Sequence, residues 1–306
     1  MKSAPTIRLR HLSAFLVLSV LVAAIASCER PMSDDIGGSE PTEEGLAHLR
    51  VSAMTSSEVS FSAVQPARRK ASAVANACSC ITFAIYKDGE RVAVENQNAD
   101  DSDFGECDIV LPKATYRIVA VGHNGTSSAT TTEVEKIKFP NNKMTDTFWC
   151  TSIVNLDGDT DISLNLQRVV AMFRLIVKDE IPANVAEMKF YYTGGSSTLS
   201  GVTGFGSVNS KQTEVRTVDE STRKGGAEFE IYTIPHEQTG TLTITVTALD
   251  ASGNTVKETT FNNVAVTVNK IRQYEGEFFS ESPEEGRGKA VVTVDDEWGG
   301  TDTEGY

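Results

Sequence analysis

The fold class is decided by the stretch Thr241-Leu242-Thr243-Ile244-Thr245-Val246-Thr247, in which threonine and aliphatic residues alternate without a break. Successive side chains of a β-strand point to opposite faces of the sheet, so this alternation places the threonines on one face and the aliphatic side chains on the other. Both residue types favour extended backbone. The stretch is therefore typical of a strand that is buried on one face only.

Short segments of the same kind occur along most of the chain. In the first half they cover residues 49–54, 59–64, 80–86, 91–95, 108–111, 116–122 and 134–139. In the second half they cover residues 162–166, 169–177, 187–192, 228–234, 242–249, 256–261, 264–268, 273–279 and 290–294. Dipeptides that suit tight hairpins, Asp88-Gly89 and Asn124-Gly125, separate some of them. Because no segment shows sustained helical periodicity, the sequence predicts an all-β protein with antiparallel sheets.

These segments fall into two sets, which indicates two β-sandwich domains. About 260 residues follow the N-terminal region, enough for two domains of ordinary size. The acidic turn Asp157-Gly158-Asp159-Thr160-Asp161 separates the sets. We therefore place the domains at residues 46–160 and 161–306.

The N-terminal region has the features of a secretory signal peptide. Basic residues precede an apolar run over residues 14–26, which only Ser19 interrupts and which is too short to span a bilayer. The run leads into Ile25-Ala26-Ser27-Cys28, the lipobox pattern of an aliphatic residue, small residues and the cysteine that receives diacylglycerol. We predict that residues 1–27 are removed and that Cys28 carries the acyl chains of a stable lipid anchor, palmitate among them. An ordinary signal peptide with a chance cysteine is the alternative.

The segment behind the predicted anchor is polar and acidic. Residues 28–45 are rich in glycine, proline and carboxylates and hold hardly any large apolar side chain, which is typical of a flexible tether. Residues 1–27 contain three basic residues and no acidic one, so their removal takes the formal charge from −14 to −17. This charge argues against a nucleic acid partner, because phosphate binding needs a basic patch. An acidic stretch behind a lipidated cysteine also resembles the signal that exports some lipoproteins to the outer face of the outer membrane.

The sequence offers little for catalysis or for a cofactor. His48, His123 and His236 do not have the spacing of a metal site or a catalytic triad, and no nucleophile elbow, phosphate loop or dinucleotide-binding glycine pattern is present. We therefore predict no catalytic residue, no cofactor and no metal, and a protein that is not an enzyme. The turn at residues 157–161 and the run 100–103 hold carboxylates for calcium, but neither has the glutamate of an EF-hand loop, which favours polar turns.

Four cysteines remain once the anchor is assigned: Cys78, Cys80, Cys107 and Cys150. Export permits disulfides, and the number is even. Cys78 and Cys80 lie two residues apart on one face of an expected strand, so they do not bridge each other without distortion. Disulfides to Cys107 or Cys150 are the first interpretation, free buried thiols the second and a metal site a distant third.

Several stretches together resemble a known family of surface proteins. They are residues 104–105 with 111–124 (Leu-Pro-Lys-Ala-Thr-Tyr-Arg-Ile-Val-Ala-Val-Gly-His-Asn), 166–175 (Leu-Gln-Arg-Val-Val-Ala-Met-Phe-Arg-Leu), 179–182 (Asp-Glu-Ile-Pro) and 268–279 (Val-Asn-Lys-Ile-Arg-Gln-Tyr-Glu-Gly-Glu-Phe-Phe). They resemble the FimB/Mfa2-type and fimbrillin-like subunits of type V pili. The stretches are spread over most of the mature chain, and each is a hydrophobic pattern rather than a fingerprint.

The resemblance implies a function in fimbrial assembly. It implies two transthyretin-like sandwich domains in a cell-surface lipoprotein of the outer membrane, serving as the anchor, shaft or tip of a fimbrium. Subunits of that family assemble by strand donation after a trypsin-like protease removes a first strand, and the neighbour's strand then pairs with the open sheet edge. The basic candidates for that cleavage are Arg50 and the cluster Arg68-Arg69-Lys70. The expected partners are the membrane, other fimbrial subunits and surface ligands of the host or of other bacteria.

Two other classes of function compete with this interpretation. A glycan-binding outer-membrane lipoprotein grips sugar rings with exposed aromatic side chains, and the chain has only Trp149 and Trp298 as tryptophans. A secreted hydrolase on a β scaffold needs two carboxylates paired in a cleft, and the sequence does not pair them. The fimbrial structural subunit is therefore the first hypothesis.

Overall fold

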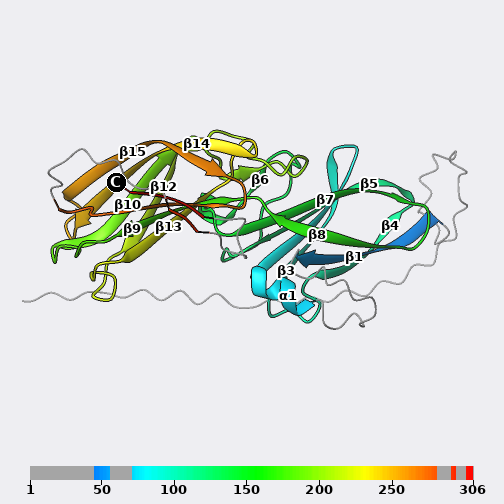
Figure 1. Cartoon of the computed structure of the whole chain (residues 1–306). Helices are drawn as coiled ribbons and strands as arrows, with labels where there is room; N and C mark the ends of the chain where they lie inside the picture. The colour runs from blue at the N-terminus through cyan, green and yellow to red at the C-terminus, as the bar shows by residue number, and fades with distance from the viewer. Residues whose placement is uncertain (1–44, 56–70, 281–290, 294–300, 306) are drawn as a thin grey trace, which may run out of the picture. The chain divides into compact units, whose positions relative to one another are not determined.

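The computed structural model describes residues 45–55, 71–280, 291–293 and 301–305 (Figure 1). Strands dominate these residues, which confirms the all-β class. The described helical elements include α1 (Ala71–Ala77) and the short 3₁₀ helix η4 (Pro140–Asn142). Among the described residues no helix is long and apolar enough to cross a membrane.

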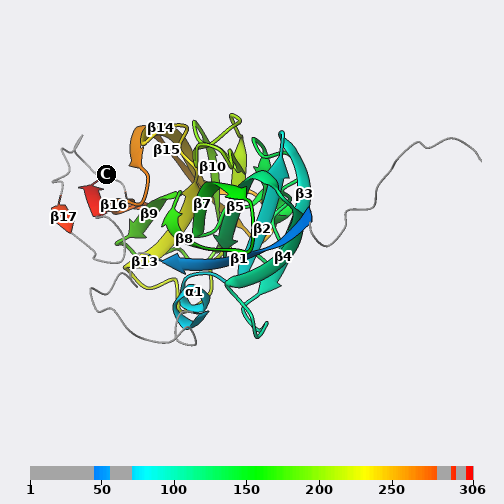
Figure 2. The same ribbon diagram turned by 90° about the vertical axis from the view of Figure 1, so that its right-hand side faces the viewer.

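A seven-stranded sheet forms the first lobe, residues 45–168. Its strands, in sheet order, are β3 (Glu90–Asn98), β2 (Cys80–Lys87), β5 (Ala114–His123), β7 (Thr147–Leu156), β8 (Thr160–Arg168), β1 (Leu46–Thr55) and β4 (Glu106–Pro112). The sheet encloses a core of apolar side chains that includes Leu49, Phe83 and Leu156. Helix α1 packs beside β1 and contributes Val74 to this core (Figure 2).

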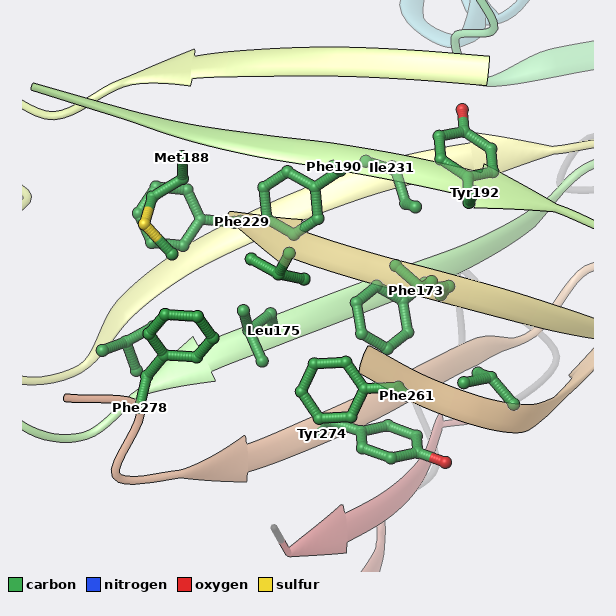
Figure 3. Close-up of a cluster of buried hydrophobic side chains, with 14 of the residues drawn as sticks. Phe173, Leu175, Met188, Phe190, Tyr192, Phe229, Ile231, Phe261, Tyr274 and Phe278 are labelled. Carbon is green, nitrogen blue, oxygen red and sulfur yellow. The ribbon is translucent and has the colours of Figure 1, made fainter. Parts of the chain in front are cut away.

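Two sheets form the second lobe, residues 171–280 with 291–293 and 301–305. The first, in sheet order, has β12 (Gln212–Thr217), β10 (Val185–Thr193), β14 (Thr239–Asp250) and β15 (Thr255–Thr267). The second has β13 (Ala227–Thr233), β9 (Ala171–Val177), β16 (Ile271–Gly276), β18 (Thr301–Gly305) and β17 (Val291–Thr293). Figure 3 shows the aromatic side chains of the core of this lobe, in which the ring of Phe173 lies 5.5 Å from that of Tyr274 and 6.0 Å from that of Phe261.

The alternating stretch at residues 241–247 lies within β14, as predicted. Leu242, Ile244 and Val246 are buried in the core of the second lobe. Thr241 and Thr243 point to the other face and are exposed. The burial of one face thus explains the alternation up to Val246, whereas Thr247 is itself buried and donates a hydrogen bond of 2.9 Å to Glu258 Oε2.

A third apolar cluster joins the two lobes. It combines Val119 and Val121 of β5 with Met172 of β9 and Ile271 of β16. The two-stranded sheet of β6 (Ile137–Lys138) and β11 (Thr198–Leu199) lies in the same region, because Ile137 and Leu199 belong to this cluster. The lobes therefore share buried surface.

The sheets differ from the expected antiparallel arrangement in three strand pairs. The pairs β1–β8, β9–β16 and β16–β18 are parallel. Parallel neighbours need a long connection, and these pairs are far apart in the sequence. Local hairpin signals do not reveal such pairs. The expectation of antiparallel sheets is therefore correct for the other described strand pairs and wrong for these three.

Several expected segments also have different limits in the structure. Of residues 134–139, only Ile137–Lys138 form a strand, and the segments 256–261 and 264–268 form the single strand β15. Strands β7, β11, β12 and β18 and helix α1 were not predicted. Residues 59–64 lie outside the described residues. Strand β8 begins at Thr160, within the acidic stretch 157–161 that was taken as the domain boundary, yet it pairs with β7 and β1 of the first lobe.

Candidate functional site

Strand β1 occupies the interior of the seven-stranded sheet. It pairs antiparallel with β4 on one side, from Leu46↔Pro112 to Ser52↔Glu106, and parallel with β8 on the other, from Leu49↔Thr160 to Thr55↔Leu166. Strand β1 is therefore an interior strand of this sheet and not an edge strand. The long-range pairing with β8 gives β1 its second neighbour.

The two faces of β1 have opposite character. Ala47, Leu49, Val51 and Ala53 are at most 3% exposed and pack in the core of the first lobe. The side chains between them point outward and are polar at positions 48, 50 and 52. Removing this strand would therefore expose an apolar slot together with the unpaired backbone groups of β4 and β8.

Arg50, a candidate cleavage residue, lies in the middle of β1. Its Nε donates to Asp108 Oδ2 at 3.2 Å, and its guanidinium nitrogens lie 3.8 Å from Asp159 Oδ2 and 3.5 Å from Asp161 Oδ1. The hydrogen bond with Asp108 raises the pKa of Arg50. Hydrogen bonds from His48 and Arg50 lower the pKa of Asp108. Arg50 is thus held within a doubly paired strand.

The other expected processing residues cannot be placed. Cys28, the predicted site of lipidation, and the cluster Arg68, Arg69 and Lys70 lie outside the described residues.

The carboxylates considered for calcium take part in contacts within the protein. Asp159 Oδ1 accepts a hydrogen bond of 3.0 Å from the backbone N–H of His48, and Asp157 Oδ2 accepts one of 2.6 Å from the side-chain amide of Asn155. In the other run, Asp101 Oδ2 accepts a bond of 2.7 Å from the backbone N–H of Asn98. Within the described part of the chain, no group of three or more histidine, cysteine or acidic side chains has a metal-binding arrangement.

The histidines His48, His123 and His236 lie in separate environments. His48 contacts Asp108 on the surface, and His236 Nδ1 lies 2.8 Å from the carbonyl oxygen of Gly206. His123 is fully buried, its Nδ1 accepts a bond of 2.9 Å from the backbone N–H of Gly125, and burial lowers its pKa to about 4.

The four cysteines are free thiols in the structure, rather than the disulfide partners that we expected. The thiol of Cys78 donates to Val74 O at 3.6 Å, and that of Cys80 donates to Gly125 O at 3.4 Å. Burial raises the pKa of Cys78 and of Cys107 to about 12. These thiols therefore behave as small apolar side chains of the core.

Of the expected C-terminal strand at residues 290–294, the structure describes residues 291–293, which form β17 at the edge of the second lobe. Strand β18 pairs parallel with β16 from Ile271↔Thr301 to Glu275↔Gly305, and β17 pairs antiparallel with β18. The side chain of Arg272 on β16 also contacts Glu304 on β18 at 3.4 Å. Strand β18 is therefore the element that covers the edge of β16.

Trp149 of β7, one of the two tryptophans considered for sugar binding, packs at the junction of the lobes. Its Nε1 donates to the carbonyl oxygen of Gly201 at 3.1 Å. The backbone of Gly204 lies so close to the indole that an added Cβ would come within 2.6 Å of it. This ring face is occupied by the protein itself, and Trp298 lies outside the described residues.

Comparisons with known proteins give a family and a set of similar folds. The family model described as fimbrillin-A associated anchor proteins Mfa1 and Mfa2 matches residues 54–303. The structure is similar to that of the fimbrial anchor protein Mfa2 from Porphyromonas gingivalis, with 16% identity, 70% of this chain and 82% of that chain covered, and a TM-score of 0.40. It is also similar to a fimbrial assembly protein from Parabacteroides distasonis, with 13% identity, 76% and 90% covered, and a TM-score of 0.38. No curated protein sequence matches the chain.

Proposed function

Because this chain belongs to the family of fimbrillin-A associated anchor proteins Mfa1 and Mfa2, we propose that it is a lipid-anchored subunit that holds a type V fimbrium on the cell surface. The observation that carries this proposal is the family match over residues 54–303, which covers nearly all of the chain behind the predicted lipobox. In this role the chain is structural and does not act as an enzyme.

The anchor role is favoured over the shaft and tip roles by the position of Arg50. A shaft subunit of the family loses its first strand by cleavage, whereas an anchor keeps that strand and its lipid. Strand β1 is paired on both sides, and Arg50 is bound by three carboxylates. Proteases need a locally unfolded chain, and this residue lies in a central strand. These contacts support a chain that is not cleaved at Arg50, so that the first lobe stays covalently joined to Cys28.

Attachment of the next subunit by strand donation would use the second lobe. The edge of β16 is covered by the chain's own strand β18, so exchange of that strand for one from a neighbour provides a route to pairing between subunits. Main-chain hydrogen bonds would supply the affinity, and alternate side chains would supply the specificity.

We also propose that the two lobes are the two transthyretin-like sandwich domains of the family. The boundary then lies after Arg168 rather than at residue 160, because β8 pairs with β1 and β7. The first domain would comprise residues 46–168. Residues 28–45 would form the tether that joins this domain to the outer face of the outer membrane.

The decisive experiment is the variant Cys28→Ala in the native cell. Wild-type protein should incorporate a fatty-acid analogue and retain fimbriae on the cell, because the thioether requires the sulfur of Cys28. The variant should lose the label and release fimbriae into the medium, as seen by electron microscopy with an antibody to this protein. Equal fatty-acid labelling of wild type and variant rejects the lipid anchor. If wild-type protein is labelled but the antibody does not detect it at the base of fimbriae, the anchor role is rejected.

A further inference from the structure

We propose that the parallel pairing of β1 with β8 is a mechanical clamp, which resists tension between the N-terminal end of the chain and the second lobe. The inference rests on the proposed function, because tension arises when one end is held in the membrane and the other carries a fibre. The geometry of the clamp depends only on the described strands.

The path of the load follows from the chain connectivity. Tension from the N-terminal side enters the fold at Leu46, the first residue of β1. On the other side, β8 ends at Arg168 and β9 of the second lobe begins at Ala171, so only two residues separate them. Because β1 and β8 are parallel, this tension pulls β1 toward its own N-terminus and pulls β8 toward its C-terminus. The two strands are loaded in opposite directions along a common axis.

This direction loads the backbone hydrogen bonds in shear. The register joins seven residues of β1 to seven of β8, from Leu49↔Thr160 to Thr55↔Leu166, and a displacement along the strands strains all these hydrogen bonds at once. A pull perpendicular to the strands would break them one after another. The ladder between β1 and β4 on the other side of β1 is loaded in shear as well, so β1 (Figure 1) is held from both sides.

Side chains on the outer face add bonds across the same pair of strands. Ser52 Oγ lies 3.0 Å from Ser163 Oγ and donates to Ile162 O at 3.4 Å. Arg50 contacts Asp161 at 3.5 Å, and the backbone N–H of His48 donates to Asp159 at 3.0 Å. Each of these contacts must break before β1 slides by one residue.

The end of β8 is fixed at the junction with the second lobe. Arg168 donates two hydrogen bonds to the carboxylate of Asp146, at 2.7 and 2.9 Å, and a third to Asn269 Oδ1 at 3.0 Å. Asn269 lies between β15 and β16, so these bonds connect β8 to the second lobe beside the covalent link. The load therefore reaches β8 without first unfolding the junction.

Single-molecule pulling in two geometries tests the clamp. The chain from residue 28 onward, with Cys28→Ser, carries one handle at its N-terminus and a second handle either at Glu180, beyond β9, or at Lys113, beside the start of β1. The first geometry loads β1 and β8 in shear, and the second peels β1 from β4 starting at Leu46↔Pro112. We expect a rupture force at least about twofold higher in the first geometry at the same loading rate, because forced unfolding follows the barrier along the pulled direction. Equal forces overturn the proposal.

A matched pair of variants tests the contribution of the side chains. The double variant Ser52→Ala, Ser163→Ala removes the hydroxyl bridge between β1 and β8 and should lower the force in the shear geometry alone. Thr115→Ala removes a hydroxyl contact with Asn155 between β5 and β7, away from the clamp, and should leave that force unchanged. A loss in both geometries, or with both variants, contradicts the clamp. These measurements need neither lipid nor fimbria, so a negative result leaves the anchor proposal standing. Conversely, a failure of Cys28 to incorporate the fatty-acid analogue in cells rejects the lipid anchor but does not affect the pulling measurements.

Discussion

The side-chain oxygen of Gln97 accepts a hydrogen bond of 2.9 Å from the backbone N–H of Gly105. Its amide nitrogen donates to the carbonyl oxygen of Glu106 at 2.6 Å. Gln97 lies on β3 and Glu106 begins β4, so one side chain connects the two edge strands of the seven-stranded sheet. Gln97 is only 3% exposed, which shields these bonds from water.

Loss of this bridge should destabilise the first lobe. Gln97→Ala leaves the N–H of Gly105 without its side-chain acceptor, and we expect the free energy of unfolding to fall by about 2 kcal/mol. Chemical denaturation measures the change. The control is Gln167→Ala on the exposed face of β8, which should change stability by less than about 0.5 kcal/mol. Equal effects of the two substitutions would show that the hydrogen bonds of Gln97 between β3 and β4 do not stabilise the first lobe.

Arg50 should resist cleavage in the native chain. Its strand is hydrogen-bonded on both sides, so trypsin reaches the peptide bond after Arg50 only when the first lobe opens. Lys224, exposed in the loop before β13, should be cut faster under native conditions. Mass spectrometry of a limited tryptic digest compares the two sites. Cleavage after Arg50 that keeps pace with cleavage after Lys224 would contradict the retained strand.

The cysteine state can be counted directly. We expect four reactive thiols besides Cys28 when the mature protein is unfolded without reductant, because all four are free in the structure. In the native protein, Cys78 and Cys107 should react slowly, since burial raises their pKa to about 12 and thiolate is scarce at neutral pH. A thiol reagent such as dithionitrobenzoate gives both the number and the rates. Two or fewer thiols after unfolding would restore the disulfide interpretation.

His123 should make stability depend on pH in the acidic range. Its folded pKa of about 4 lies below the unfolded value of about 6.5, so the unfolded chain binds the proton more tightly. The stabilisation due to neutral His123 is therefore complete above pH 7 and is lost as the pH falls from about 6.5 to about 4, by up to about 3 kcal/mol.

Denaturation at several pH values in this range, on wild type and His123→Phe, isolates the contribution. The variant should show a shallower decline between about pH 6.5 and pH 4, whatever its stability at neutral pH. Gln167→Ala, on an exposed side chain that carries no titratable group, is the control and should keep the wild-type slope. Identical slopes for wild type and His123→Phe would mean that this histidine titrates normally.

The strands that could be predicted from the sequence are those with one face packed on a core and the other face exposed to solvent. The alternation at residues 241–247 identified β14 because one face of that strand packs on a core and the other does not. Strand β7 was missed, since the junction covers Trp149 on the face that would otherwise be exposed and the pattern does not alternate cleanly. Strand β12 is a short, polar edge strand, and its sequence resembles a loop.

The candidate site was predictable in its residues but not in its geometry. Arg50 was identified from its charge, whereas the central position of β1 depends on pairing with β8, about 110 residues later in the sequence. The bridge through Gln97 has no sequence signal, because a buried glutamine is indistinguishable from a surface one until its partners are known. Local sequence patterns do not show which distant strands pair with each other.

Truncation after Ser282 tests the role of the C-terminal strands. It removes β17 and β18 and retains the core side chains that the structure describes in the second lobe, the last of which are Phe278 and Phe279. We therefore expect a folded monomer whose β16 is exposed along the edge that β18 covers, and such an edge should aggregate or bind a complementary strand. If the protein is the anchor, the truncated protein reaches the membrane but assembles abnormally with its neighbour.

The full-length variant Asp302→Pro, which removes one backbone donor opposite Arg272, should weaken the same pairing of β16 with β18 without changing chain length. Unfolding of the truncated protein would make β17 and β18 an integral part of the second lobe, and normal assembly of both variants would exclude β18 from the interface between subunits.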